Sequence, residues 1–156
     1  MIHHITVAVR DYEKAKAFFA AALRPLGYGV AMEFGTFCGM GVAGKPDLWL
    51  APEDAQHPVG AQHIAFGARS TKEVDAFHAA ALAAGATDNG PPGPRPDYSP
   101  GYYGAFVIDA DGHNLEAVCF VTQKKAARKV TRKPARAAKS AKKPRAAKKA
   151  AKRGRR

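Results

Sequence analysis

Alternating hydrophobic and polar residues near the start of the chain predict a strand followed by a helix. Residues 2–9 alternate, so that Ile5 and the alternate apolar residues after it share one face of the expected strand, and His4 lies on the opposite face. Asp11 then provides a good helix N-cap, apolar residues follow at helical spacing, and Gly27 marks the expected helix end. The pattern therefore predicts one strand–helix unit here.

The same pattern occurs a second time along the chain. A shift of 59 positions superposes the two copies over twenty residues without a gap. The aligned pairs include His4 with His63, Arg10 with Arg69, Phe18 with Phe77 and Leu23 with Leu82. In the second copy, a capping box at 70–73 predicts the helix start and Gly85 the helix end. Matching alanines alone do not explain this register, so we infer an internal duplication.

Strand-like segments separated by turn residues follow each helix. They cover residues 34–42, 47–51, 104–108 and 114–121. The last two flank residues 109–112, whose sequence Asp-Ala-Asp-Gly is typical of a hairpin turn. The chain is therefore predicted to contain an α+β domain over residues 1–121, built from two βαβββ modules at about 1–55 and 60–121.

Charge divides the chain after residue 121. Residues 122–156 hold seventeen of the 25 Lys and Arg and none of the 13 acidic residues, so this tail carries +17. Residues 1–121 hold eight basic and 13 acidic residues, a net charge of −5. The tail has no aromatic residue and no apolar residue larger than valine, so it cannot bury enough surface to offset chain entropy. We expect residues 122–156 to be disordered.

The tail is predicted to bind DNA or RNA without sequence preference and to lose affinity as salt rises. By composition alone it resembles the lysine- and alanine-rich tails of linker histones and bacterial histone-like proteins. The expected phosphate-binding cations are Lys124, Lys125, Arg128, Lys129, Arg132, Lys133, Lys142, Lys143, Arg145, Lys148, Lys149, Lys152 and Arg153. The alternatives are a solubility tail, a contact with an anionic membrane surface, or a segment without a selected function.

Two distant cysteines in apolar surroundings, Cys38 and Cys119, have neither zinc-ligand spacing nor the density of a secreted disulfide scaffold. No signal peptide and no membrane span is indicated. The protein is therefore expected in the cytoplasm, where the tail would associate it with the nucleoid.

Three residues in the modules form a candidate metal site. His4 and His63 leave equivalent strands on the face opposite the large apolar residues, so both point toward the concave side of a curved sheet. Glu116 lies in an otherwise apolar strand, where a charge is costly unless it is paired or bound to a metal. Two imidazoles and one carboxylate suit Fe, Mn, Zn or Ni as a divalent ion. Taken singly, each residue also fits a structural role, and His3 points away from the cavity.

The motifs at 4–19, 62–66 and 109–117 together resemble the vicinal oxygen chelate superfamily, which includes glyoxalase I, extradiol dioxygenases and fosfomycin- and bleomycin-resistance proteins. The resemblance implies two modules whose eight strands form a curved, mostly antiparallel sheet around a cavity. It also implies metal ligands at His4, His63 and Glu116. The modules either close within one chain or pair across a dimer, and we predict a homodimer.

One position departs from glyoxalase I, which takes a fourth ligand, a glutamate, from the last strand of the first module. Aligning Leu48 with Leu115 places Trp49 at that position, opposite Glu116 in the repeat. Tryptophan cannot bind a metal, so the resemblance is closer to the three-ligand dioxygenases and fosfomycin-type transferases. In those proteins a tyrosine often lies ten residues before the glutamate, and here that residue is Phe106.

A proline-rich segment at 90–104 is predicted to be a stiff loop beside the site. It either only connects two strands or forms a wall of the cavity. In the second case the expected substrate-binding residues are Arg95, Tyr98, Tyr102, Tyr103 and, from the first module, Trp49. By residue type, however, Trp49, together with Met32, Phe34 and Phe37, is more often assigned to the core than to ligand contacts. We assign three further histidines to the surface, His57, His78 and His113.

These features predict a metal-dependent enzyme that acts on a small oxygen-rich substrate by bidentate metal chelation. Glu116 is the expected catalytic residue, and the reaction would be lyase-, isomerase- or dioxygenase-like. The alternative is a metal-free protein that binds and sequesters an aromatic or antibiotic-like molecule.

Overall fold

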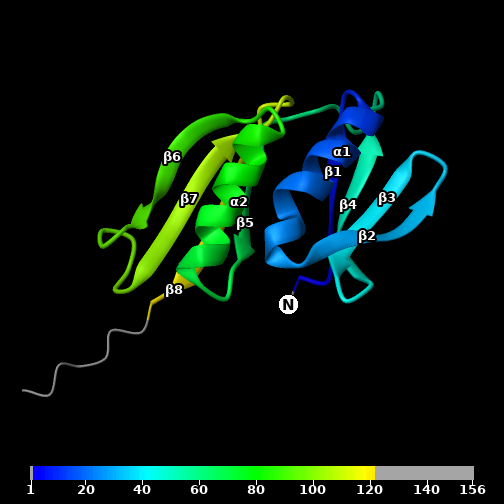
Figure 1. Cartoon of the computed structure of the whole chain (residues 1–156). Helices are drawn as coiled ribbons and strands as arrows, with labels where there is room; N and C mark the ends of the chain where they lie inside the picture. The colour runs from blue at the N-terminus through cyan, green and yellow to red at the C-terminus, as the bar shows by residue number, and fades with distance from the viewer. Residues whose placement is uncertain (1, 122–156) are drawn as a thin grey trace, which may run out of the picture. The chain divides into compact units, whose positions relative to one another are not determined.

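The structure of the protein, a computed structural model, describes residues 2–121. The predicted disorder of residues 122–156 lies outside this range. In the first module the elements are β1 (Ile5–Val9), α1 (Tyr12–Leu23), the 3₁₀ helix η1 (Arg24–Leu26), β2 (Tyr28–Phe34), β3 (Phe37–Val42) and β4 (Lys45–Pro52). In the second they are β5 (His63–Gly67), α2 (Thr71–Ala83), β6 (Thr87–Pro94), β7 (Tyr102–Ile108) and β8 (Asn114–Phe120). The predicted order βαβββ is thus present twice (Figure 1).

Each module forms its own four-stranded mixed sheet. The strand orders are β1-β4-β3-β2 and β5-β8-β7-β6, with β1 parallel to β4, β5 parallel to β8 and the other four pairs antiparallel. The α+β class, the eight strands and their mostly antiparallel pairing are confirmed. Within residues 2–121, however, the strands form two sheets and not one continuous sheet. Helices α1 and α2 pack against each other, so the modules meet through their helices and leave β1 and β5 as edge strands (Figure 1).

The core lies between the helices and one face of each sheet. Phe19 of α1 and Phe77 of α2 are fully buried, together with Leu50 of β4 and Leu115 of β8. Removing these apolar side chains from water is the main stabilising contribution to such a fold. The opposite face of each sheet is left open, and it carries the exposed His63 in the second module.

The helices begin and end where the sequence predicts. Asp11 accepts a hydrogen bond from Lys14 N at 3.2 Å, and the Ser70 hydroxyl accepts one from Glu73 N at 3.3 Å. The reciprocal bond of the capping box is shifted by one residue, since Glu73 accepts from Arg69 N at 2.8 Å. Glycines at 27 and 85 follow the helices with φ of 86° and 101°, a left-handed conformation that favours glycine.

Two strands, β2 and β6, were not located by the sequence pattern. The first five residues of the predicted loop 90–104 belong to β6, which contains Pro91, Pro92 and Pro94. A proline has no N–H for a ladder hydrogen bond, so its presence argues against a central strand. β6 is tolerated because it lies at the edge of its sheet.

Several predicted burial assignments are wrong. Three apolar side chains assigned to the core are 45–61% exposed, Met32, Phe34 and Phe37. They follow the open face of β2 and β3, and not the helix-covered face. Two histidines assigned to the surface are buried instead: His78 hydrogen-bonds Asp88 at 2.8 Å, and His113 has no exposed surface. His57 is exposed, as predicted.

Within residues 2–121, no helix is long and apolar enough to cross a membrane. Cys38 and Cys119 are both buried free thiols.

Candidate metal and substrate site

A histidine and a buried carboxylate meet on the open face of the second sheet. The parallel register of β5 and β8 sets Ala65 opposite Glu116, so His63 and Glu116 lie two residues apart along one face. His63 Nε2 is 3.1 Å from Glu116 Oε2. The Glu116 side chain is 3% exposed and that of His63 51% exposed. The carboxylate thus lies at the base of the site and the imidazole at its rim.

Tyr102 of β7 holds the other oxygen of this carboxylate. Its hydroxyl donates to Glu116 Oε1 at 2.5 Å. Burial, followed by the hydrogen bond to the carboxylate, raises the pKa of Tyr102 to about 12. The phenol therefore stays protonated at neutral pH and remains a donor to Glu116.

Two asparagines extend the same polar cluster. Asn114 Nδ2 is 2.7 Å from His63 Nδ1, and Asn89 Nδ2 donates to Asn114 Oδ1 at 3.2 Å. Sequence reasoning missed both residues. Asn114 shares the face of Glu116 two positions along the strand, so alternation alone would have indicated it. Asn89 lies on β6, a strand that the sequence pattern did not locate.

Arg95 and Tyr98 complete a cavity of about 510 Å³ around these groups, as the sequence predicts for a cavity wall. Arg95 Nη2 donates to Pro91 O at 2.7 Å, and its guanidinium lies 5.6 Å from the centre of the Phe106 ring. Tyr98 is 62% exposed and meets Tyr102 edge to face, with ring centres 5.3 Å apart. The cavity thus combines a fixed cation with aromatic surface.

Tyr103 is not part of this cavity. Because successive residues of a strand point to opposite faces, Tyr103 lies on the helix-covered side while Tyr102 faces the site. The Tyr103 hydroxyl donates to Asp75 of α2 at 2.9 Å. Its predicted role in substrate binding therefore lacks structural support.

His4 lies apart from His63 and Glu116, in a cavity of about 550 Å³ in the first module. Asp47, Trp49 and His3 line the same cavity, and His3 Nδ1 is 2.9 Å from His4 Nδ1. Hence His3 does not point away, contrary to expectation. Among residues 2–121, no group of three His, Cys, Asp or Glu is close enough to hold a metal. One chain thus brings together two of the three predicted ligands.

The predicted equivalence of Trp49 and Glu116 has structural support. Thr6 pairs with Trp49 across β1 and β4, as Ala65 pairs with Glu116 across β5 and β8. The Trp49 ring lies over Gly39, where an added Cβ would come within 2.9 Å of the ring. The same ring stacks on that of Phe34, with ring centres 6.4 Å apart. The first module therefore presents an aromatic surface at the position where the second presents a carboxylate.

The two donors fit a divalent metal by type. A neutral imidazole and a carboxylate are both common ligands of Fe, Mn, Zn and Ni, and an ion would offset the cost of burying the Glu116 charge. They supply half of a typical ligand set or less, and the described lining of this cavity includes no other His, Cys, Asp or Glu.

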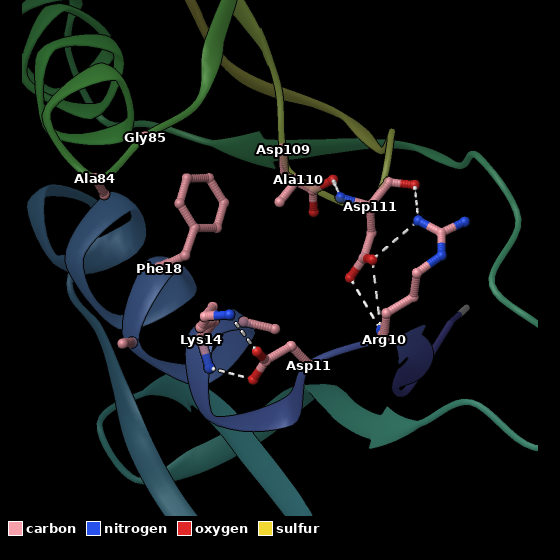
Figure 2. Close-up of a pocket in the computed structure, with 11 residues that line it drawn as sticks. Arg10, Asp11, Lys14, Phe18, Ala84, Gly85, Asp109, Ala110 and Asp111 are labelled. Carbon is pink, nitrogen blue, oxygen red and sulfur yellow. Dashed lines mark hydrogen bonds and ion pairs between the residues drawn. The ribbon is translucent and has the colours of Figure 1, made fainter.

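A third cavity, of about 620 Å³, lies between the start of α1, the end of α2 and the turn between β7 and β8 (Figure 2). Its charged groups pair with one another: Arg10 Nη1 is 3.2 Å from Asp111 Oδ1, and Lys14 Nζ is 2.7 Å from Asp11 Oδ2. Burial raises the pKa of Asp109, which accepts hydrogen bonds from backbone N–H groups of the turn. The Arg10–Asp111 ion pair thus links the two modules beside this cavity.

The model of the Glyoxalase/Bleomycin resistance protein/Dioxygenase superfamily matches residues 1–117. The chain belongs to this superfamily. The predicted resemblance is thereby confirmed. No match to the chain is found among curated proteins.

Solved structures of superfamily members share this fold. A glyoxalase/bleomycin resistance protein from Albidiferax ferrireducens is 29% identical with a TM-score of 0.66, and the match covers 74% of this chain and 95% of that one. The oxidase ChaP-H2 is 26% identical with a TM-score of 0.57, and the match covers 78% of this chain and 94% of that one. A family enzyme from Burkholderia phytofirmans, at 19% identity and a TM-score of 0.61 over 77% and 98%, supports the fold alone.

Loss of the Tyr102 hydroxyl is expected to destabilise this superfamily member more than loss of the adjacent Tyr103 hydroxyl. Tyr102→Phe removes a partner from the buried Glu116 and should lower the free energy of unfolding by about 1–3 kcal/mol. Tyr103→Phe removes a bond to the exposed Asp75 and should cost about 0–1 kcal/mol. Urea unfolding of the two variants makes the comparison, and equal losses would contradict the role of Tyr102.

Proposed function

We propose that the protein is a metal-dependent enzyme that acts on a small oxygen-rich molecule. The observation that carries this proposal is the approach of His63 Nε2 to Glu116 Oε2, 3.1 Å apart in an open cavity. A carboxylate that is 3% exposed needs compensation for its lost hydration, and a cation held between these two groups would supply it. Superfamily membership is consistent with this chemistry.

We propose further that His4 of a second copy provides the third ligand. β1 and β5 are edge strands. β1 begins directly after His4, and β5 begins at His63. Pairing β1 of one chain with β5 of another would join two four-stranded sheets into the predicted eight-stranded one. A homodimer would therefore contain two equivalent sites.

The residues of this chain then have distinct roles. A bound divalent ion would polarise a substrate oxygen as a Lewis acid. Arg95 binds an anionic group of the substrate, and Tyr98 offers aromatic contact with a phenol donor. Trp49 closes the cavity from the facing module. Glu116, oriented by Tyr102, is positioned to hold a proton that leaves the substrate.

Among residues 2–121, the first module offers Trp49, which is not a metal ligand, at the position equivalent to Glu116. Trp49 replaces a ligand at the position equivalent to Glu116, which favours a three-donor site with open positions for two substrate oxygens. Lyase-, isomerase- and dioxygenase-like reactions all begin with such chelation. If the protein binds its small molecule without needing the three proposed metal ligands, the alternative function, metal-free sequestration, is expected instead.

Removal of any proposed ligand is expected to abolish tight metal binding. The parent protein, prepared metal-free and titrated with Co²⁺, should bind about one ion per chain. His4→Ala, His63→Ala and Glu116→Ala should each lower the affinity for Co²⁺ by more than about 100-fold. This is a larger loss than removal of an outer-shell partner typically causes. His57→Ala is the control, because His57 is exposed and pairs with Asp54. Unchanged Co²⁺ affinity in Glu116→Ala would exclude the proposed site, and ligand binding that survives all three changes would favour sequestration.

We also propose that the tail at 122–156 attaches the enzyme to nucleic acid and so places it at the nucleoid in the cytoplasm. The seventeen cations of this segment and its lack of acidic residues support this role. The domain at 1–121 has a net charge of −5 and would not attract polyanions by itself.

Truncation after Val121 is expected to abolish DNA binding. The full chain should bind duplexes of unrelated sequence equally, and affinity should fall steeply between about 50 and 200 mM salt, by about 10³-fold or more if six or more phosphates are neutralised. Fluorescence anisotropy at several salt concentrations measures both effects. Retained affinity in the truncated protein, or a preference for one sequence, would contradict the proposal.

A further inference from the structure

A chain of hydrogen bonds with a single direction leads to Glu116. Asn89 Nδ2 donates to Asn114 Oδ1, and Asn114 Nδ2 lies 2.7 Å from His63 Nδ1. An amide nitrogen only donates, so His63 Nδ1 must accept. The ring proton is then on Nε2, which faces Glu116 Oε2 at 3.1 Å. Together with Tyr102, the chain directs two donors at the carboxylate.

This proton arrangement conflicts with metal binding by His63. A histidine that binds a metal through Nε2 carries its remaining proton on Nδ1 and needs an acceptor there. In the arrangement described here, the atom that faces Nδ1 is a donor, the Asn114 amide nitrogen. The side-chain amide of Asn114 must therefore turn over so that Oδ1 accepts. Its nitrogen then faces Asn89, whose amide must turn as well.

We propose that Asn114 and Asn89 are positioning residues that select the tautomer of His63 and reverse together when a metal binds. Nε2 releases its proton to solvent and Nδ1 takes one up, so the ring stays neutral. This inference rests on the proposed metal site at His63 and Glu116. It adds that the affinity of the site for a metal depends on two amides that are not themselves ligands of the metal.

Among residues 2–121, the first module does not repeat this relay. Asp47 holds the register position equivalent to Asn114, since Ile64 pairs with Leu115 and Ile5 with Leu48. His4 Nδ1, however, lies 2.9 Å from His3 Nδ1, and Asp47 accepts a hydrogen bond from the Tyr28 hydroxyl at 3.1 Å. The amide relay is thus confined to the second module.

Variants at Asn114 separate positioning from simple structural support. Asn114→Asp keeps an acceptor and removes the donor, so it should favour the Nδ1–H tautomer before metal is added and bind Zn²⁺ as tightly as the parent or up to about 10-fold tighter. Asn114→Leu removes both and should weaken Zn²⁺ binding by about 10–100-fold. Gln62→Leu is the matched control, since Gln62 is an exposed amide beside His63, outside the cavity. Asn89→Ala, on the edge strand, tests the relay if Asn114→Leu does not fold.

The readouts are Zn²⁺ affinity by chelator competition and the ring ¹⁵N shifts of His63, assigned by their absence in His63→Ala. The parent should hold the Nε2–H tautomer without metal and the Nδ1–H tautomer with Zn²⁺. Asn114→Leu should show mixed tautomers without metal. Parent-like shifts and affinity in both Asn114→Leu and Asn89→Ala would overturn the proposal, as would an Nδ1–H tautomer in the metal-free parent.

Failure of the proposed function gives a different result. If the parent does not bind Zn²⁺, the metal site and the reversal both fail. Loss of the single tautomer in metal-free Asn114→Leu would then still support control of His63 by Asn114.

Discussion

The site depends on the cost of keeping the Glu116 carboxylate charged inside an apolar strand. A buried charge must be compensated by hydrogen bonds, an opposite charge or a metal, or it protonates. Tyr102 and His63 occupy its two oxygens, and Asn114 and Asn89 in turn constrain His63. The polar residues of this face thus all serve one carboxylate. Each oxygen of Glu116 needs a donor, and each donor must be held in a suitable geometry.

A second constraint comes from the packing of α1 against α2. This contact joins the two modules through their helices, while the strands of each module form a separate sheet. His4 is thereby kept away from the cavity that holds His63 and Glu116. The edge strands β1 and β5 each pair with one strand only among residues 2–121. Under our proposal, completion of the site by a second copy would account for both the unpaired edges and the missing ligand.

The sequence predicted the contents of each module better than the arrangement of the two. Period-two alternation and the repeat located the facing side chains of His63 and Glu116 and the equivalence of Trp49, because these depend on local strand geometry. The same rule fails for β6, where prolines remove the strand signal, and so it missed Asn89. It also missed the separation of His4, because alternation specifies which face a residue takes and not which edges or faces of two modules meet.

The most direct test of a shared metal site is subunit mixing. His4→Ala and Glu116→Ala each lack a site as homodimers, but in a heterodimer one of the two sites receives all its ligands from intact positions. After subunit exchange of an equal mixture, Co²⁺ binding should recover to about a quarter of the parent stoichiometry, since about half of the dimers are mixed and each has one intact site. No recovery after demonstrated exchange would contradict a site built across two chains.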